Sequence, residues 1–176
     1  VAVLSMSWAG AAAFPHVFEA GVSTLTDRLG LRVQEYPTTR ASANGAQVDP
    51  RLRAADMNAA FADDAVAAIV ATIGGDDSAR ILPHLDADLI RANPKVLMGY
   101  SDTAAQLVFC HNLGLVTFNG PSVMAGLAQL DAEAIASGLD DAVAVYQDGS
   151  DDDIAVLVVR AKAPHPIGST LGPDTR

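Results

Sequence analysis

An apolar run at residues 67–73 limits the fold of this chain more than any other sequence feature. It reads Ala-Ala-Ile-Val-Ala-Thr-Ile and stops abruptly at Gly74-Gly75. A short apolar run that ends at glycines and does not alternate with polar residues predicts a strand buried on both faces. Such strands occur in parallel sheets that helices cover on both sides. The run therefore predicts an α/β fold.

Four further short segments predict strands, and helical patterns separate them. The predicted strands cover residues 1–5, 31–36, 67–73, 96–100 and 116–119. The predicted helices cover residues 14–29, 49–62, 80–82, 87–92 and 102–113. This alternation predicts a doubly wound, mostly parallel five-stranded sheet with helices on both faces, as in flavodoxin-like and class I amidotransferase-like domains. In such sheets, ligands bind beyond the carboxyl ends of the strands.

Charge and cysteine content exclude several classes of protein. The chain has 11 Lys and Arg against 21 Asp and Glu, which gives a net charge of −10. Nucleic acids and anionic membranes bind basic patches, so we expect neither as a partner. The single Cys110 excludes an internal disulfide and a cysteine-based zinc site, and its place in a predicted helix indicates a buried side chain.

Targeting signals give a further expectation. No apolar run reaches the roughly 18 residues that a membrane span needs. No basic segment precedes the apolar start of the chain, as it would in a signal peptide. We therefore expect a cytoplasmic protein. A first residue that is Val1 instead of methionine also indicates a fragment.

Ser101 stands where a predicted strand meets a predicted helix. The strand covers residues 96–100, Gly99 lies two positions before the serine, and the helix covers residues 102–113. α/β hydrolases hold their nucleophile at such a turn, with the hydroxyl exposed and facing helix-terminal N–H groups. The sequence lacks the second glycine of the G-x-S-x-G motif, and serines often cap helices. An ordinary N-cap is therefore the alternative interpretation.

Gly74 and Gly75 end the central predicted strand. Two glycines at this place let backbone N–H groups approach a ligand closely. Together with the N–H of Asp102, they predict an oxyanion hole that would bind the negative charge formed when Ser101 attacks a carbonyl. The alternative is a flexible turn between the strand and the next helix.

Two other kinds of site have little support in the sequence. Asp76 and Asp77 are paired acids, but we interpret them as solvated carboxylates, not metal ligands, because no histidine lies near them. No G-x-G-x-x-G run follows the first strand, which argues against a dinucleotide site. We expect no metal and no organic cofactor.

The residues around Gly75 and Ser101 resemble the LD-carboxypeptidase family of serine peptidases. The segments that carry the resemblance are residues 73–86, 90–95, 99–103 and 114–121. The family includes muramoyltetrapeptide carboxypeptidases and the microcin C immunity peptidases. The paired acids after Gly75 are closer to the immunity branch. The resemblance extends from residue 1 to about residue 130.

This resemblance implies a set of roles for the residues that match. Ser101 would be the nucleophile, and the N–H groups of Gly75 and Asp102 would form the oxyanion hole. A separate C-terminal domain would supply a Glu and a His. The substrate would be a murein tetrapeptide, cut at its C-terminal end, or a peptidyl-nucleotide, and neither reaction needs a cofactor.

Residues 131–176 depart from the family pattern. They do not resemble the family's C-terminal domain, and we interpret them as an atypical tail after a domain of residues 1–130. His165 lies between two prolines and Glu133 on a predicted helix face, so neither is assigned as a base. Residues 149–160 resemble the closing strand of metal-dependent serine/threonine phosphatases, but too few residues accompany them to form that site. We therefore expect a truncated peptidase with little or no hydrolysis.

The alternative function is a non-catalytic α/β binding or interaction module derived from the same family. A domain without its usual C-terminal partner exposes the apolar face that this partner covers. Homo-oligomers would form through that face. A clean monomer in light scattering would argue against it.

Overall fold

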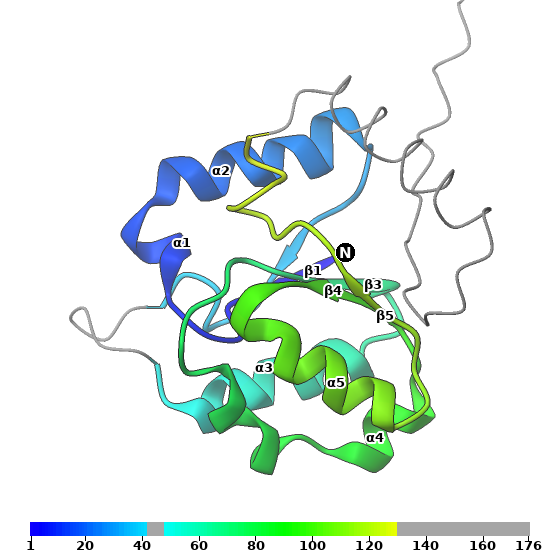
Figure 1. The fold of residues 1–176 in the computed structure, drawn as a ribbon. Coiled ribbons are helices and arrows are strands. Elements are labelled where there is room, and N and C mark those ends of the chain that lie inside the picture. Colours follow the sequence, from blue (N-terminus) through cyan, green and yellow to red (C-terminus); the bar gives the residue numbers. More distant parts are fainter. Residues whose placement is uncertain (42–47, 130–176) are drawn as a thin grey trace, which may run out of the picture.

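A parallel five-stranded sheet forms the centre of the computed structural model, which describes residues 1–41 and 48–129 (Figure 1). Its strands are β1 (Ala2–Leu4), β2 (Gln34–Glu35), β3 (Ala68–Ala71), β4 (Val96–Gly99) and β5 (Thr117–Asn119). Their order is β2-β1-β3-β4-β5, and each neighbouring pair is parallel. This is the flavodoxin-like order, so the predicted fold class is confirmed.

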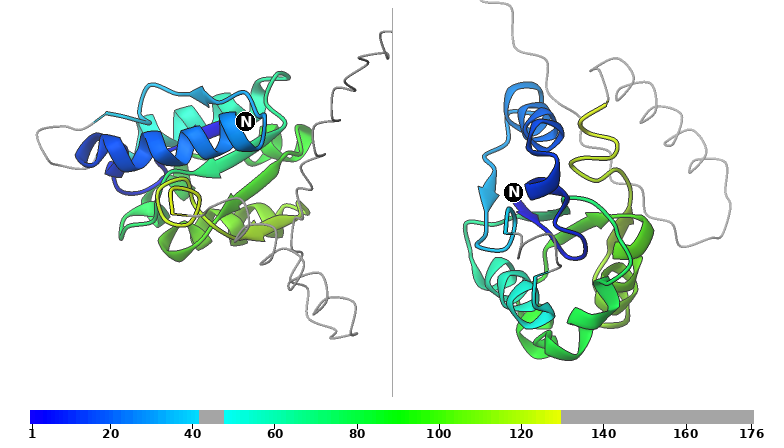
Figure 2. Two further views of the ribbon diagram at one scale, coloured as in Figure 1. Left: turned by 90° about the horizontal axis from the view of Figure 1, so that it is seen from above. Right: turned by 90° about the vertical axis from the view of Figure 1, so that its left-hand side faces the viewer.

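Helices cover both faces of the sheet (Figures 1 and 2). One face carries α1 (Gly10–Ala13) and α2 (Pro15–Ser23), which continues as the π-helix η1 (Thr24–Arg28). The other face carries α3 (Pro50–Ala62), α4 (Ala87–Ala92) and α5 (Ala104–Asn112). Two 3₁₀ segments, η2 (Ser78–His84) and η3 (Ser101–Thr103), follow β3 and β4. Within the described residues, no helix is long and apolar enough to cross a membrane.

The central strand β3 supplies side chains to two separate apolar cores. Ile69 belongs to the core under α3, α4 and α5, which includes the buried Phe61. Val70 belongs to the core under α1 and α2, which includes the buried Phe18. Because both faces of β3 are covered, its sequence has no polar face, which is what the apolar run at 67–73 predicts.

The second strand is shorter than its sequence predicts. β2 has two residues, whereas the predicted strand covers residues 31–36. At one end, the N–H of Leu31 donates to the carbonyl of Leu25 at 2.9 Å and closes the preceding helix. At the other end, the N–H of Tyr36 donates to the Oγ1 of Thr39 at 2.9 Å. In a longer strand these two N–H groups would be available for sheet hydrogen bonds, but the turns use them instead.

The segment after β5 returns to the α2 face of the sheet (Figure 1). The N–H of Val123 donates to the carbonyl of Ala71 at 3.0 Å, and the N–H of Met124 donates to that of Thr72 at 2.9 Å. The backbone of Val123 also touches α2 at Gly21. A Cβ at Gly21 would lie 2.1 Å from the carbonyl oxygen of Val123, so only glycine fits there. The predicted tail at residues 131–176 lies outside the described residues.

We predict that Gly21→Ala destabilises the fold even though alanine favours helices over glycine by about 1 kcal/mol. The added methyl group meets backbone atoms of Val123 that cannot move without breaking their hydrogen bonds to β3. Overpacking of this kind costs about 1–3 kcal/mol. Urea unfolding measures the change, and Ala20→Ser on the exposed side of α2 is the control, expected to change the free energy of unfolding by less than about 1 kcal/mol. A Gly21→Ala variant at least as stable as the parent would contradict the close approach.

Candidate active site

Ser101 has a strained backbone at the carboxyl end of β4. Its φ of 60° is the one positive φ of a non-glycine residue in residues 1–41 and 48–129. A left-handed conformation costs about 1–3 kcal/mol and occurs at functional turns, including the nucleophile turn of α/β hydrolases. Ser101 is exposed, and its hydroxyl makes no hydrogen bond to another described residue. No side chain caps η3 or α5, so the N-cap interpretation of Ser101 is wrong.

Two glycines let the chain pass closely around this turn. A Cβ at Gly99 would lie 2.5 Å from the Oγ1 of Thr103. A Cβ at Gly74 would lie 3.0 Å from both the Cβ and the Oγ of Ser101, and 3.4 Å from the backbone N of Asp102. The loop after β3 is therefore in contact with the turn after β4. This contact brings together the two sequence motifs that were predicted to form one site.

The predicted oxyanion-hole groups lie on these two segments. Gly75 has a φ of 157°, and a Cβ there would lie 2.3 Å from the Oγ of Ser7. Its N–H donates no hydrogen bond to any described residue. Asp102 lies in the first turn of η3, where N–H groups have no acceptor within the helix. Gly74 and Gly75 are thus tightly packed, which argues against the flexible-turn interpretation.

The carboxylate of Asp102 joins three loops. Its Oδ2 accepts hydrogen bonds from the Oγ of Ser7 at 2.5 Å, the N–H of Asp77 at 3.0 Å and the N–H of Ser78 at 2.8 Å. The hydroxyl of Ser78 donates to the carbonyl of Asp102 at 2.6 Å. Partial burial acts to raise the pKa of Asp102, but the hydrogen bonds from Ser7, Ser78 and Asp77 outweigh it and lower the pKa below its usual value.

A buried ion pair fixes the same loop to α3. The guanidinium of Arg53 pairs with the carboxylate of Asp77, and both side chains are buried. Arg53 also donates to the carbonyls of Met6 at 2.9 Å and Val48 at 2.9 Å. The prediction that both paired acids are solvated is therefore wrong for Asp77, because a cation from α3 reaches it; Asp76 is exposed.

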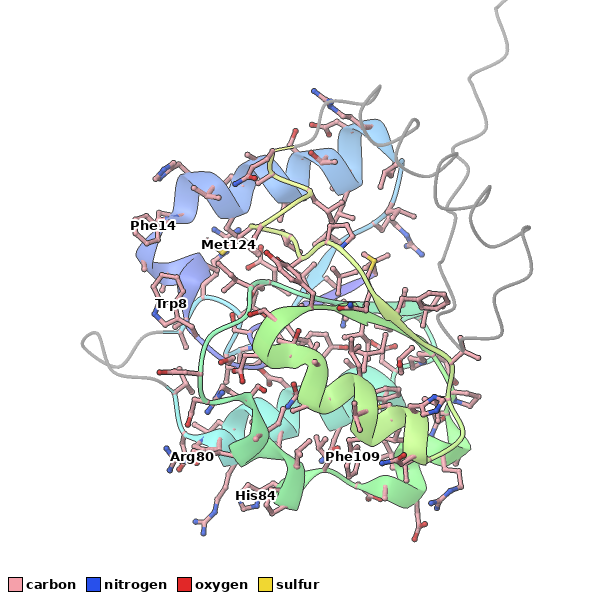
Figure 3. The ribbon with its side chains drawn as sticks, in the orientation of Figure 1. Trp8, Phe14, Arg80, His84, Phe109 and Met124 are labelled. Atoms are coloured by element: carbon pink, nitrogen blue, oxygen red, sulfur yellow. The ribbon has the colours of Figure 1, made fainter. Side chains whose placement is uncertain are left out.

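No base for Ser101 lies in the described part of the chain. His16, His84 and His111 are exposed, and none donates to or accepts from Ser101. Figure 3 shows His84 near Arg80, on the η2 segment. His165 and Glu133 lie outside the described residues. Cys110 is buried, as predicted, and burial raises the pKa of its thiol to about 12.

An open pocket is lined by Tyr100, the residue before Ser101 in the sequence. It has a volume of about 460 Å³. Its other lining residues are Asn119, Gly120, Pro121, Ala125, Gly126 and Gln129. None of these side chains carries a charge, so the pocket offers an aromatic ring and two amide groups to a ligand. Within residues 1–41 and 48–129, no three His, Cys, Asp or Glu side chains lie together as a metal site would require.

The sequence analysis missed the side chains that hold the site together. Ser7, Arg53 and Ser78 received no role, and Asp102 was assigned through its backbone only. One signal was available: Ser7 and residues 75–78 both follow predicted neighbouring strands, so their loops share one edge of the sheet. Arg53 gave a weaker signal, as a charged residue among the apolar positions of a predicted helix.

A comparison with protein families shows which family the chain belongs to. Residues 1–120 match the model described as the LD-carboxypeptidase N-terminal domain. The chain belongs to the LD-carboxypeptidase family. Among curated relatives, the microcin C7 self-immunity protein MccF of Escherichia coli is 45% identical over 73 residues, which are 41% of this chain and 21% of MccF. The putative carboxypeptidase YocD of Bacillus subtilis is 39% identical over 101 residues, 56% of this chain and 30% of YocD.

Solved structures of the LD-carboxypeptidase family have the same fold. Wild-type MccF without ligand superposes with a TM-score of 0.71 at 31% identity, over 76% of this chain and 40% of MccF. An MccF-like protein from Streptococcus pneumoniae, in complex with AMP, superposes with a TM-score of 0.68 at 31% identity, over 85% of this chain and 45% of that protein. The chain thus spans less than half the length of these relatives.

We predict that Arg53→Met destabilises the domain by about 3–5 kcal/mol, because it leaves the buried carboxylate of Asp77 without its main partner. Arg80→Met is the matched control. Arg80 also pairs with Asp77, at 3.2 Å, but its side chain is 70% exposed, so the expected loss is below about 1 kcal/mol. Urea unfolding of both variants gives the two free energies. Equal losses would contradict the dominant role of Arg53.

We predict that Asp102 contributes stability that is lost in acid. Its pKa is lower in the folded state than in the unfolded chain, so the contribution is complete above the usual value of 3.8 and disappears as the pH falls through the folded value. Asp102→Asn is expected to be less stable at neutral pH and to lose less on acidification than the parent. Urea midpoints between about pH 7 and about pH 2 measure this. Asp88→Asn, at an exposed carboxylate, should keep the parent's acid slope.

Proposed function

We propose that this domain carries the nucleophile and the oxyanion hole of an LD-carboxypeptidase-like serine peptidase, a hydrolase of amide bonds. One observation supports this most strongly: the left-handed backbone of Ser101 at a strand-to-helix turn, in contact with the Gly74-Gly75 loop. A serine that served only the fold would gain nothing from this costly conformation. A nucleophile needs it, because the turn holds the hydroxyl away from the sheet.

The reaction follows from these positions. The Oγ of Ser101 attacks the carbonyl carbon of the scissile amide and loses its proton to a base. The carbonyl oxygen becomes an oxyanion, which accepts hydrogen bonds from the N–H groups of Gly75 and Asp102. The C–N bond then breaks, the amine leaves with the proton, and water hydrolyses the acyl-serine.

The base is the part of this mechanism that residues 1–41 and 48–129 do not supply. The family resemblance implies a Glu and a His from a C-terminal domain. A serine without a base is a poor nucleophile at neutral pH, and loss of a triad member lowers the rate by several orders of magnitude. We therefore propose that this chain hydrolyses amides weakly or not at all unless such groups reach Ser101.

The relatives and the pocket at Tyr100 support a proposal for the substrate class. MccF has been solved in complex with aspartyl sulfamoyl adenosine, and a Bacillus subtilis relative, 45% identical over 76 residues, is a probable murein peptide carboxypeptidase. The pocket of about 460 Å³ beside Tyr100 has the size of a short peptide segment. We propose a small peptide or a peptidyl-nucleotide as the substrate. A cytoplasmic location stays a prediction.

A non-catalytic binding module is the second candidate function. It is consistent with the absence of a base among the described residues, and it retains the pocket beside Tyr100 as a peptide site. Self-association through an exposed face stays a prediction for this candidate. It gives no reason, however, for the strained Ser101 or for the Gly75 N–H that donates to no described residue.

Covalent labelling with an alkyl fluorophosphonate tests the catalytic proposal. The Oγ of Ser101 forms a bond to phosphorus, fluoride leaves, and the serine proton goes to solvent. Because the reagent is highly activated, it reports a weak nucleophile that releases no measurable product from an amide. Intact-protein mass spectrometry counts the adducts, and peptide mapping locates them. We expect one adduct, at Ser101, formed faster as the pH rises.

Two variants make this test specific. Ser101→Ala should abolish the adduct, whereas Ser23→Ala, at an exposed serine on α2, should leave it unchanged. Labelling of Ser23 and Ser101 at equal rates, or no labelling of Ser101, would contradict the role of Ser101 as the nucleophile.

A further inference from the structure

We propose that the side chain of Asp102 is a positioning group that holds the Gly75 N–H in place for the oxyanion. This inference rests on the proposed function, since an oxyanion hole has meaning only with a nucleophile. The family resemblance gives Asp102 a role through its backbone N–H. The hydrogen bonds of its carboxylate indicate a second role, which acts on the other donor of the oxyanion hole, the N–H of Gly75.

The loop from Gly74 to Ser78 is held at both of its ends. At one end, Gly74 lies against Ser101, and its carbonyl accepts from the N–H of Trp8 at 3.4 Å. At the other end, the N–H groups of Asp77 and Ser78 donate to the Asp102 carboxylate at 3.0 and 2.8 Å. Gly75 is one of two residues between these fixed points. Its N–H direction therefore depends on both anchors.

Ser7 links the carboxylate to Gly75 directly. Its hydroxyl donates to the Oδ2 of Asp102 at 2.5 Å and accepts from the N–H of Asp77 at 3.2 Å. The same Oγ would lie 2.3 Å from a Cβ added at Gly75, which is too close for any residue other than glycine. Ser7 thus packs against Gly75 because Asp102 holds its hydroxyl there. Loss of the carboxylate would release both Ser7 and the loop.

Gln106 supports the arrangement from α5. Its Nε2 donates to the carbonyl of Ser78 at 2.7 Å, and its side chain is fully buried. Ser78 consequently uses its N–H, its hydroxyl and its carbonyl to connect Asp102 with α5. Within the described residues, the Oε1 of Gln106 accepts no hydrogen bond. The bond to Ser78 is therefore the one side-chain hydrogen bond of Gln106 within the described residues.

Hydrogen exchange tests the positioning role independently of any reaction. Asp102→Asn keeps the size of the side chain and removes its charge. In this variant we expect the amides of Asp77 and Ser78, which donate to the carboxylate, to exchange at least about tenfold faster, while those of β1 and α3 keep their rates. Ser7→Ala removes one of the three donors and should give a smaller change at the same amides. Asp88→Asn, an exposed carboxylate on α4, is the matched control.

Fluorophosphonate labelling gives the second readout. In the adduct-forming step, the phosphonyl oxygen takes the place of the oxyanion, so a displaced Gly75 N–H slows this step and leaves reversible binding of the reagent unchanged. We expect Asp102→Asn to lower kinact about tenfold or more at an unchanged KI. A general loss of stability would instead change both kinact and KI, and it would speed amide exchange throughout the domain.

The two readouts separate the two proposals. Parent-like exchange at Asp77 and Ser78 in Asp102→Asn would overturn the positioning role, as would faster exchange spread evenly over the sheet. Unchanged kinact with faster local exchange would also overturn it, because the loop would then move without effect on the oxyanion. Failure of the parent protein to label at Ser101 would count against the nucleophile, and the exchange data alone would decide the role of Asp102.

Discussion

The Oδ2 atom of Asp102 is the point on which the candidate site depends. It accepts hydrogen bonds from loops that follow β1 and β3, while Asp102 itself follows β4. One oxygen atom thus joins the carboxyl ends of three neighbouring strands. Hydrogen bonds to a charged acceptor contribute about 1.5–3 kcal/mol each, which is enough to offset the roughly 1–3 kcal/mol cost of the left-handed Ser101. The strained turn persists because the next residue is fixed on both its backbone and its side chain.

The sheet order explains why these loops meet. The chain leaves β1 toward β2 on one side and returns to β3 on the other, so the switch point lies between β1 and β3. Ser7 and Gly75 lie at the carboxyl ends of these two strands, and Ser101 lies beside them at the end of β4. The buried pair of Arg53 and Asp77 adds a fixed connection to α3. Such pairs contribute little net stability, and the value of this pair lies in specifying one conformation of the loop.

The fold was predictable because strong local signals determine it. The apolar run at 67–73 requires cover on both faces, and the alternation of strands and helices then leaves few arrangements. Ser101, Gly75 and Asp102 were predictable as neighbours, since all lie at strand ends on one edge. The buried state of Asp77 was not predictable, because its partner Arg53 lies 24 residues away in the sequence. The short β2 was missed because the Thr39 side chain competes for its backbone, a contact that propensity does not encode.

The central claim is that Ser101, Gly75 and Asp102 already form a site for a tetrahedral oxyanion. A peptide boronic acid tests it directly, because boron adds to the serine oxygen and becomes tetrahedral with an oxygen in the oxyanion position. The measurement is the ¹H–¹⁵N spectrum of the labelled chain with and without the boronate. The claim predicts downfield shifts of the Gly75 and Asp102 amide protons, absent in Ser101→Ala. A spectrum in which these two amides do not move, or move equally in Ser101→Ala, would contradict it.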